Sequence, residues 1–140
     1  MKLHRVLPLV LAAFAISAHA QQQRTLGCDQ ARNTLELNEC RGKQVETAEA
    51  KLKTYVAAAR SRAAELGVAA VALDAEQAAW EAYRDKYCAN VYEIWHQGTI
   101  RVEMGARCVL QVTRSRTFDV WSAYLTYADS TPPVLPDPSK

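Results

Sequence analysis

The chain has 140 residues, with 17 lysines and arginines against 15 aspartates and glutamates. This length predicts one domain of ordinary size. The near balance of charge argues against a general nucleic-acid-binding protein, because such a protein needs a net basic surface to neutralise phosphates.

The N-terminus has the three parts of a secretory signal peptide. Lys2, His4 and Arg5 form a short basic region, residues 6–16 are almost entirely apolar, and residues 18–20 are Ala-His-Ala, with small residues at the positions that a signal peptidase recognises. The apolar run is well short of the roughly 20 residues of a membrane-spanning helix. We therefore predict cleavage after Ala20 and export to the periplasm or the outside of a bacterial envelope, without membrane insertion of the mature chain.

A second possible start of the mature chain lies at residues 25–28, where Thr-Leu-Gly-Cys is similar to a lipoprotein cleavage site. Such a site needs leucine three residues before the cysteine, but Leu26 lies only two residues before Cys28, and polar residues 21–24 separate it from the apolar run. Cleavage after Ala20 has neither defect. We expect a soluble form with a flexible leader over residues 21–27.

All four cysteines, Cys28, Cys40, Cys88 and Cys108, follow the predicted signal peptide. An even number of cysteines in an exported chain predicts disulfides. A zinc site is disfavoured, because no Cys-x-x-Cys pair is present and His96 is the only histidine after cleavage. We expect two disulfides, no metal and no cofactor.

The first predicted helix ends near Leu66, before Gly67. Asn33 and Glu36 have the spacing of a capping box at its start. Apolar residues at spacings of three and four form one stripe along it, namely Val45, Ala48, Leu52, Tyr55 and Ala59.

Two further helices are predicted over residues 74–97 and 99–127, with Asp74 and Thr99 as N-caps and Gly98 between them. Gly105 is expected to weaken or bend the start of the third helix. The buried side chains expected on the second helix are Leu73, Trp80, Tyr83, Tyr87, Val91 and Ile94. Those expected on the third are Cys108, Val109, Val112, Val120 and Tyr124.

Strand-like alternation is absent, so we predict an all-α fold, a small antiparallel bundle of about three main helices over residues 28–127. Cys88 and Cys108 each lie ten residues from Gly98, so the antiparallel pair brings them to similar heights and allows a bridge. Cys28 can reach Cys40 only if it folds back onto the first turns. The four prolines of residues 128–140 predict an extended or disordered tail.

Three motifs carry a family resemblance. Cys28 is followed by Thr-Leu-Glu-Leu-Asn-Glu-Cys at residues 34–40; residues 77–88 fit Gln-x-x-Trp-x-x-Tyr/Phe-Arg-x-x-x-Cys; and Cys108 begins a Cys-x4-Thr-x-x-Arg pattern. Besides the cysteines, the residues of the second and third motifs are Gln77, Trp80, Tyr83, Arg84, Thr113 and Arg116. Together they resemble the LprI-like lysozyme inhibitor family over about residues 28–120. The resemblance implies a helical periplasmic or surface module, and some members of the family are associated with lysozyme inhibition.

A protein inhibitor can occlude the groove that holds the two carboxylates of a lysozyme. The candidate contact surface is the turn after the second helix, with His96, Gln97, Gly98, Thr99 and Arg101. The family usually has Gly-Gly-Ser before the last helix, so Gln-Gly-Thr makes a less flexible loop here. His96 has no triad or metal partner at a recognisable spacing, and we expect the chain not to be an enzyme.

Trp80, Tyr83 and Arg84 lie on nearly one face of the second helix, where they either pack in the core, with Arg84 paired to a carboxylate, or form a binding surface. Arg116 is expected to pair with an acidic residue of that helix. Residues 63–97 contain six acidic and two basic side chains, an excess that either complements the third helix or attracts a basic partner such as a lysozyme.

Two other functions stay open on the sequence alone. One is a non-inhibitory periplasmic interaction or immunity-type module, and the other is a structural stress protein without a defined ligand. A single stoichiometric partner other than a lysozyme, recovered from envelope extract, would favour the interaction module.

Overall fold

The computed structural model describes residues 27–140, in which all regular structure is helical. The elements are the short 3-10 helix η1 (Cys28–Gln30) and the helices α1 (Thr34–Glu65), α2 (Val71–Ile94) and α3 (Arg101–Tyr124). The predicted all-α class is confirmed, since no strand occurs in this part of the chain. The predicted signal peptide and nearly all of the leader lie outside the described residues.

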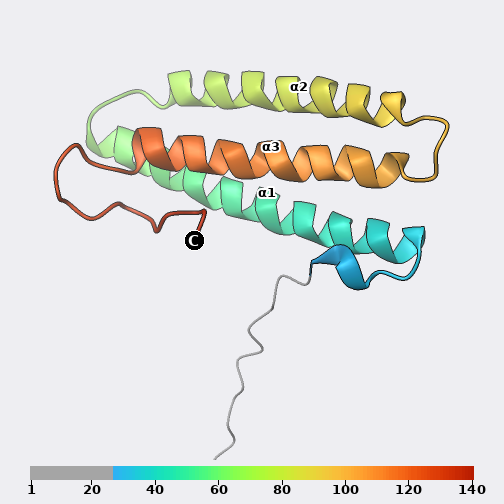
Figure 1. The fold of residues 1–140 in the computed structure, drawn as a ribbon. Helices are drawn as coiled ribbons and strands as arrows, with labels where there is room; N and C mark the ends of the chain where they lie inside the picture. Colours follow the sequence, from blue (N-terminus) through green and yellow to red (C-terminus); the bar gives the residue numbers. More distant parts are fainter. Residues whose placement is uncertain (1–26) are drawn as a thin grey trace, which may run out of the picture.

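Helix α3 lies between α1 and α2 and packs along both of them (Figure 1). It runs parallel to α1 and antiparallel to α2 (Figure 1). The backbones of α1 and α2 rarely approach each other closely, and side-chain ion pairs link the two helices. The core therefore forms mainly along α1 and α3, from Leu52, Tyr55, Val56, Ala59, Leu73, Val120 and Leu125.

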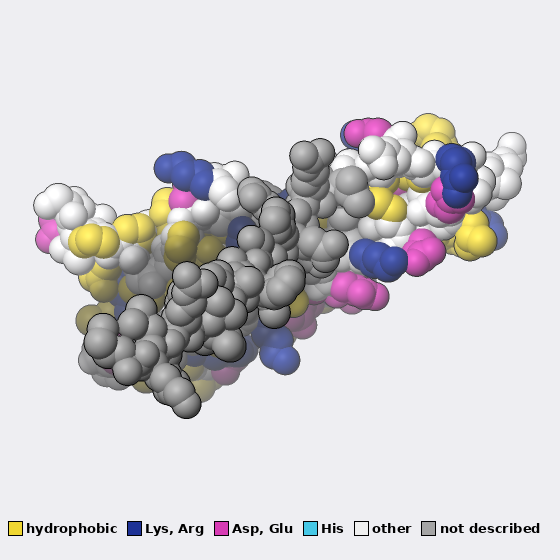
Figure 2. All heavy atoms as spheres, turned by 90° about the horizontal axis from the view of Figure 1, so that it is seen from below, with side chains coloured by type: hydrophobic (Ala, Val, Ile, Leu, Met, Phe, Trp, Pro, Cys, Tyr) yellow, Lys and Arg dark blue, Asp and Glu magenta, His cyan; other side chains and the backbone are white. Residues whose placement is uncertain are grey.

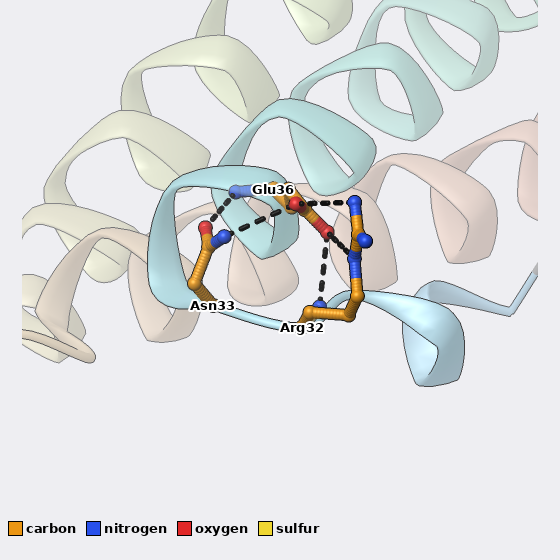
Figure 3. A network of polar contacts seen from close by, with 3 residues as sticks. All are labelled: Arg32, Asn33 and Glu36. Carbon is orange, nitrogen blue, oxygen red and sulfur yellow. Dashed lines mark hydrogen bonds and ion pairs between the residues drawn. The ribbon is translucent and has the colours of Figure 1, made fainter.

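Asn33 caps the start of α1, as predicted. Its Oδ1 accepts a hydrogen bond from the backbone N–H of Glu36 at 2.9 Å. In a capping box the Glu36 carboxylate would accept from the backbone N–H of Asn33. Here it accepts from the backbone N–H of Arg32 at 3.0 Å and also from the Arg32 guanidinium (Figure 3). These contacts hold the pKa of Glu36 below its ordinary value, and the hydrogen bond from the Arg32 backbone has the largest effect. The predicted Cys28–Cys40 disulfide folds η1 back onto the first turns of α1.

The apolar stripe predicted on α1 is confirmed at four of its five positions, which are buried, while Val45 is half-buried. The helix ends as predicted before Gly67, which has a φ of +69°. This left-handed conformation suits glycine, because a side chain there would clash with the backbone.

The N-caps predicted for the next two helices are wrong. Helix α2 begins at Val71, so Asp74 lies within its first turn and pairs there with Arg60 at 2.6 Å. Thr99 lies in the turn before α3, and neither helix has a side-chain cap. In both cases the preceding residue already has right-handed helical backbone angles, so the turn leads into the helix without a capping side chain. Both helices also end three residues before the predicted ends.

Only part of the side predicted to be buried on α2 is buried. Leu73 is buried and Trp80 is half-buried, but Tyr83, Tyr87 and Ile94 are 56%, 45% and 78% exposed. Because α2 packs mainly on α3, a narrower stripe of its surface is covered than in a helix with two neighbours. The rings of Tyr83 and Tyr87 stack on each other, with their centroids 5.6 Å apart.

The proline-rich tail is extended, but it folds back onto the bundle, which corrects the expectation of disorder. Trp121 Nε1 donates to the carbonyl oxygen of Leu135 at 2.9 Å, and the Tyr55 hydroxyl donates to that of Pro136 at 2.7 Å. The side chain of Leu135 packs against the core. Extended proline-rich backbone forms no internal hydrogen bonds, so its carbonyl oxygens can accept from donors on α1 and α3.

The described surface mixes charges of both signs. On the face shown in Figure 2, lysines and arginines are interspersed with aspartates and glutamates. Within residues 27–140, no helix combines the length and the apolar character needed to cross a membrane.

Candidate functional site

The turn between α2 and α3 forms one end of the bundle (Figure 1). The predicted Cys88–Cys108 disulfide joins the two helices behind this turn, with a Cα–Cα distance of 5.5 Å. Closer to the turn, Gly105 is buried against Tyr92, where a Cβ atom would lie 3.3 Å from the tyrosine side chain. Gly105 therefore permits a close helix contact, and α3 continues through it without a break, while the expected weakening or bending at this position stays a prediction.

The residues predicted to contact a partner are gathered at this turn, and all are exposed except Gly98, which is half-buried. Arg101 begins α3 with its guanidinium over the ring of Tyr92, 5.2 Å from the centroid. His96 Nδ1 lies 2.9 Å from the carbonyl oxygen of Glu93, so Nδ1 donates in this contact. Among residues 27–140, no side chain or carbonyl bonds to the second ring nitrogen of His96.

An apolar patch also surrounds the turn, and the sequence patterns did not predict it. Its exposed side chains are Ile94 (78%), Trp95 (43%), Ile100 (42%) and Val102 (43%). Ile94 was expected on the buried side of α2. The sequence does contain a signal for this patch, because apolar residues lie on both sides of the predicted turn. At the end of a bundle a side chain has few neighbours to pack against, so such residues stay exposed. We call residues 94–102 the tip.

The motif residues of α2 and α3 also meet in space. Arg116 Nε donates to Gln77 Oε1 at 3.2 Å, and both side chains are buried. The guanidinium groups of Arg84 and Arg116 lie over the ring of Trp80, at 5.2 Å and 6.0 Å from the ring centroid. Tyr83 is exposed and does not join this cluster. The contacts favour a structural role for the cluster, which holds α2 against α3.

Both arginines of the cluster form ion pairs. Arg116 pairs with Glu76 at 2.7 Å, which is the predicted pairing with an acidic residue of α2. Arg84 pairs with Glu49 of α1 at 3.3 Å and with Asp85 at 2.8 Å. Thr113, the remaining motif residue, is fully buried in α3.

Glu76 connects α2 to α3 through two donors. The Tyr124 hydroxyl donates to Glu76 Oε2 at 2.5 Å, and Arg116 Nη1 donates to Oε1 at 2.7 Å. The bond from Tyr124, helped by Arg116, holds the pKa of Glu76 below its ordinary value. The same bond to the carboxylate raises the pKa of Tyr124.

This network predicts a loss of stability at both ends of the pH scale. A lowered folded pKa means that the contribution of Glu76 is present above its unfolded pKa of about 4.3 and is lost as the pH falls through the folded value. A raised folded pKa means that the contribution of Tyr124 is present below about 10 and is lost as the pH rises through the folded value. Glu76→Gln should flatten both limbs of the free energy of unfolding measured by urea denaturation across pH. Glu65→Gln, at the exposed end of α1, is the control, and identical pH profiles for the two variants would contradict the prediction.

The most buried ion pair of the described residues joins Arg41 of α1 to Glu103 of α3, and the sequence did not signal it. Nε and Nη2 of Arg41 donate to the Glu103 carboxylate at 2.7–3.1 Å. Their side chains are 18% and 7% exposed. The residues lie far apart in the sequence, and charged residues on helices are usually solvated, so only the packing of α1 on α3 reveals the pair.

A family model described as lysozyme inhibitor LprI matches residues 28–119. The matched region contains both disulfides, the tip and the cluster around Trp80. No curated protein and no solved structure matches the chain.

Proposed function

Because the chain belongs to the LprI lysozyme inhibitor family, we propose that it acts outside the cytoplasm by binding and inhibiting a lysozyme. The family match carries this proposal. The two disulfides are consistent with an oxidising compartment. The signal peptide predicted over residues 1–20 supplies the route of export.

The tip is the proposed contact surface. Trp95 and Ile100 offer exposed apolar area, and tryptophan and arginine are the residue types most enriched among the dominant contacts of protein interfaces. Arg101 can donate charge-assisted hydrogen bonds to the carboxylates in the groove of a lysozyme. The disulfide and the Gly105–Tyr92 contact hold the tip in one arrangement, which lowers the entropy lost on binding.

The acidic excess of residues 63–97 supports a basic partner. Glu81, Asp85 and Glu93 are exposed on α2, the helix that leads into the tip. Their field would accelerate the encounter with a basic lysozyme, and this acceleration would fall as salt screens it.

Trp95→Ala and Arg101→Ala test this function and its site. The protein at micromolar excess should slow lysis of bacterial cell walls by an animal-type or a goose-type lysozyme. Each variant should weaken inhibition by about tenfold or more, since truncation of a dominant interface contact costs about 2 kcal/mol. Val68→Ala is the control, because Val68 is 57% exposed in the loop at the opposite end of the bundle.

The outcomes separate the function from the surface. If the unaltered protein inhibits neither class of lysozyme, the proposed function is wrong. If it inhibits and the tip variants inhibit equally well, the function stands and the tip is not the contact surface.

A further inference from the structure

We propose that a pocket between α1 and α3 binds a phosphate-type oxyanion. The pocket has a volume of about 270 Å³ and is lined by Arg41, Arg107, Leu110, Gln111 and Arg114. Three of these residues carry guanidinium groups, one carries an amide, and none is acidic. Guanidinium groups bind phosphate through paired, charge-assisted hydrogen bonds.

Arg107 and Arg114 supply the positive charge that is not neutralised. Within residues 27–140, neither side chain forms an ion pair, a hydrogen bond or a ring contact, and both are exposed. They are seven residues apart on α3, which places them on the same helix face, roughly 10 Å apart along the axis. Gln111 lies between them on that face. Other arginines of α3 are engaged, since Arg101 lies over Tyr92 and Arg116 pairs with Glu76.

Arg41 provides a third donor in a fixed position. Its contacts with Glu103 and Gln44 engage each of its three side-chain nitrogens. A guanidinium has five N–H bonds, so two remain for a ligand. Because Glu103 already compensates the charge of Arg41, the net charge of the pocket comes from the two arginines of α3.

The arrangement suits a tetrahedral oxyanion better than a carboxylate. Donors that converge from two helices can reach phosphate oxygens that point in different directions, whereas a carboxylate has two oxygens in one plane. Buried Leu110 supplies an apolar floor without competing acceptors. Either free phosphate or the headgroup of an anionic phospholipid presents this chemistry. The pocket lies outside the tip, and the proposal is independent of lysozyme inhibition.

Phosphate titration of the protein, purified from the periplasm of a bacterial host so that both disulfides form, tests the pocket. Inorganic phosphate at low ionic strength should shift the NMR signals of the Arg41, Arg107 and Arg114 side chains in a saturable manner. The double variant Arg107→Gln/Arg114→Gln should weaken binding by about tenfold or more. The control Lys53→Gln/Lys86→Gln removes the same charge from two exposed lysines outside this pocket and should bind phosphate as before.

Co-sedimentation with vesicles of phosphatidylglycerol, compared with phosphatidylcholine, identifies the source of the anion. Binding to phosphatidylglycerol that the arginine variant loses and the lysine control keeps supports a lipid headgroup. Saturable binding of inorganic phosphate without such vesicle binding supports free phosphate. If neither probe binds, or if both double variants lose binding equally, the proposal is overturned.

Discussion

Replacement of Glu103 by alanine should lower the free energy of unfolding by about 3 kcal/mol, the cost of breaking a buried ion pair from one side. The change leaves the Arg41 guanidinium, whose side chain is 18% exposed, without its counter-charge. The change also removes the carboxylate to which Nε and Nη2 of Arg41 donate. Chemical denaturation monitored by circular dichroism measures the loss.

Two controls show whether burial causes the effect. Glu39→Ala breaks an ion pair with Lys43 whose side chains are 64% and 70% exposed, and such exposed pairs contribute about 0–1 kcal/mol. The double change Arg41→Met/Glu103→Met should cost less than Glu103→Ala, because no charge is left buried. Equal losses for Glu103→Ala and Glu39→Ala would contradict the prediction.

Removal of the disulfide behind the tip should affect stability and inhibition together. Cys88→Ala/Cys108→Ala releases a constraint across 20 residues, for which the chain-entropy model predicts a loss of about 3 kcal/mol. The two helix ends that carry the tip then separate more easily. The variant should therefore inhibit more weakly even when it is fully folded. The lysis assay at a temperature where the variant is folded measures this loss.

Cys28→Ala/Cys40→Ala is the matched control. Its bridge spans 12 residues and joins η1 to α1, so it does not link the two helices that carry the tip. The same model predicts a similar stability loss, about 3 kcal/mol, but the bridge that joins α2 to α3 behind the tip stays in place. If both double variants inhibit equally well when folded, the disulfide does not organise the tip.

Features with a local cause could be predicted from the sequence. Asn33 caps α1 because its side chain reaches a backbone N–H three residues away. The stripe along α1 follows from the helical repeat alone. The disulfide pairing followed from the distances of Cys88 and Cys108 from one turn. The residues gathered at the tip are neighbours in the chain, so the structure was needed only to show which of them are exposed.

Features that depend on how many neighbours a helix has could not be predicted in this way. Helical periodicity identifies the residues that share a face, but it does not tell how much of that face another helix covers. Tyr83 and Ile94 were therefore expected to be buried, although α2 packs mainly on α3 and leaves them exposed. The Arg41–Glu103 pair and the anchored tail exist only because α3 lies beside α1, which brings distant donors and acceptors within hydrogen-bond range.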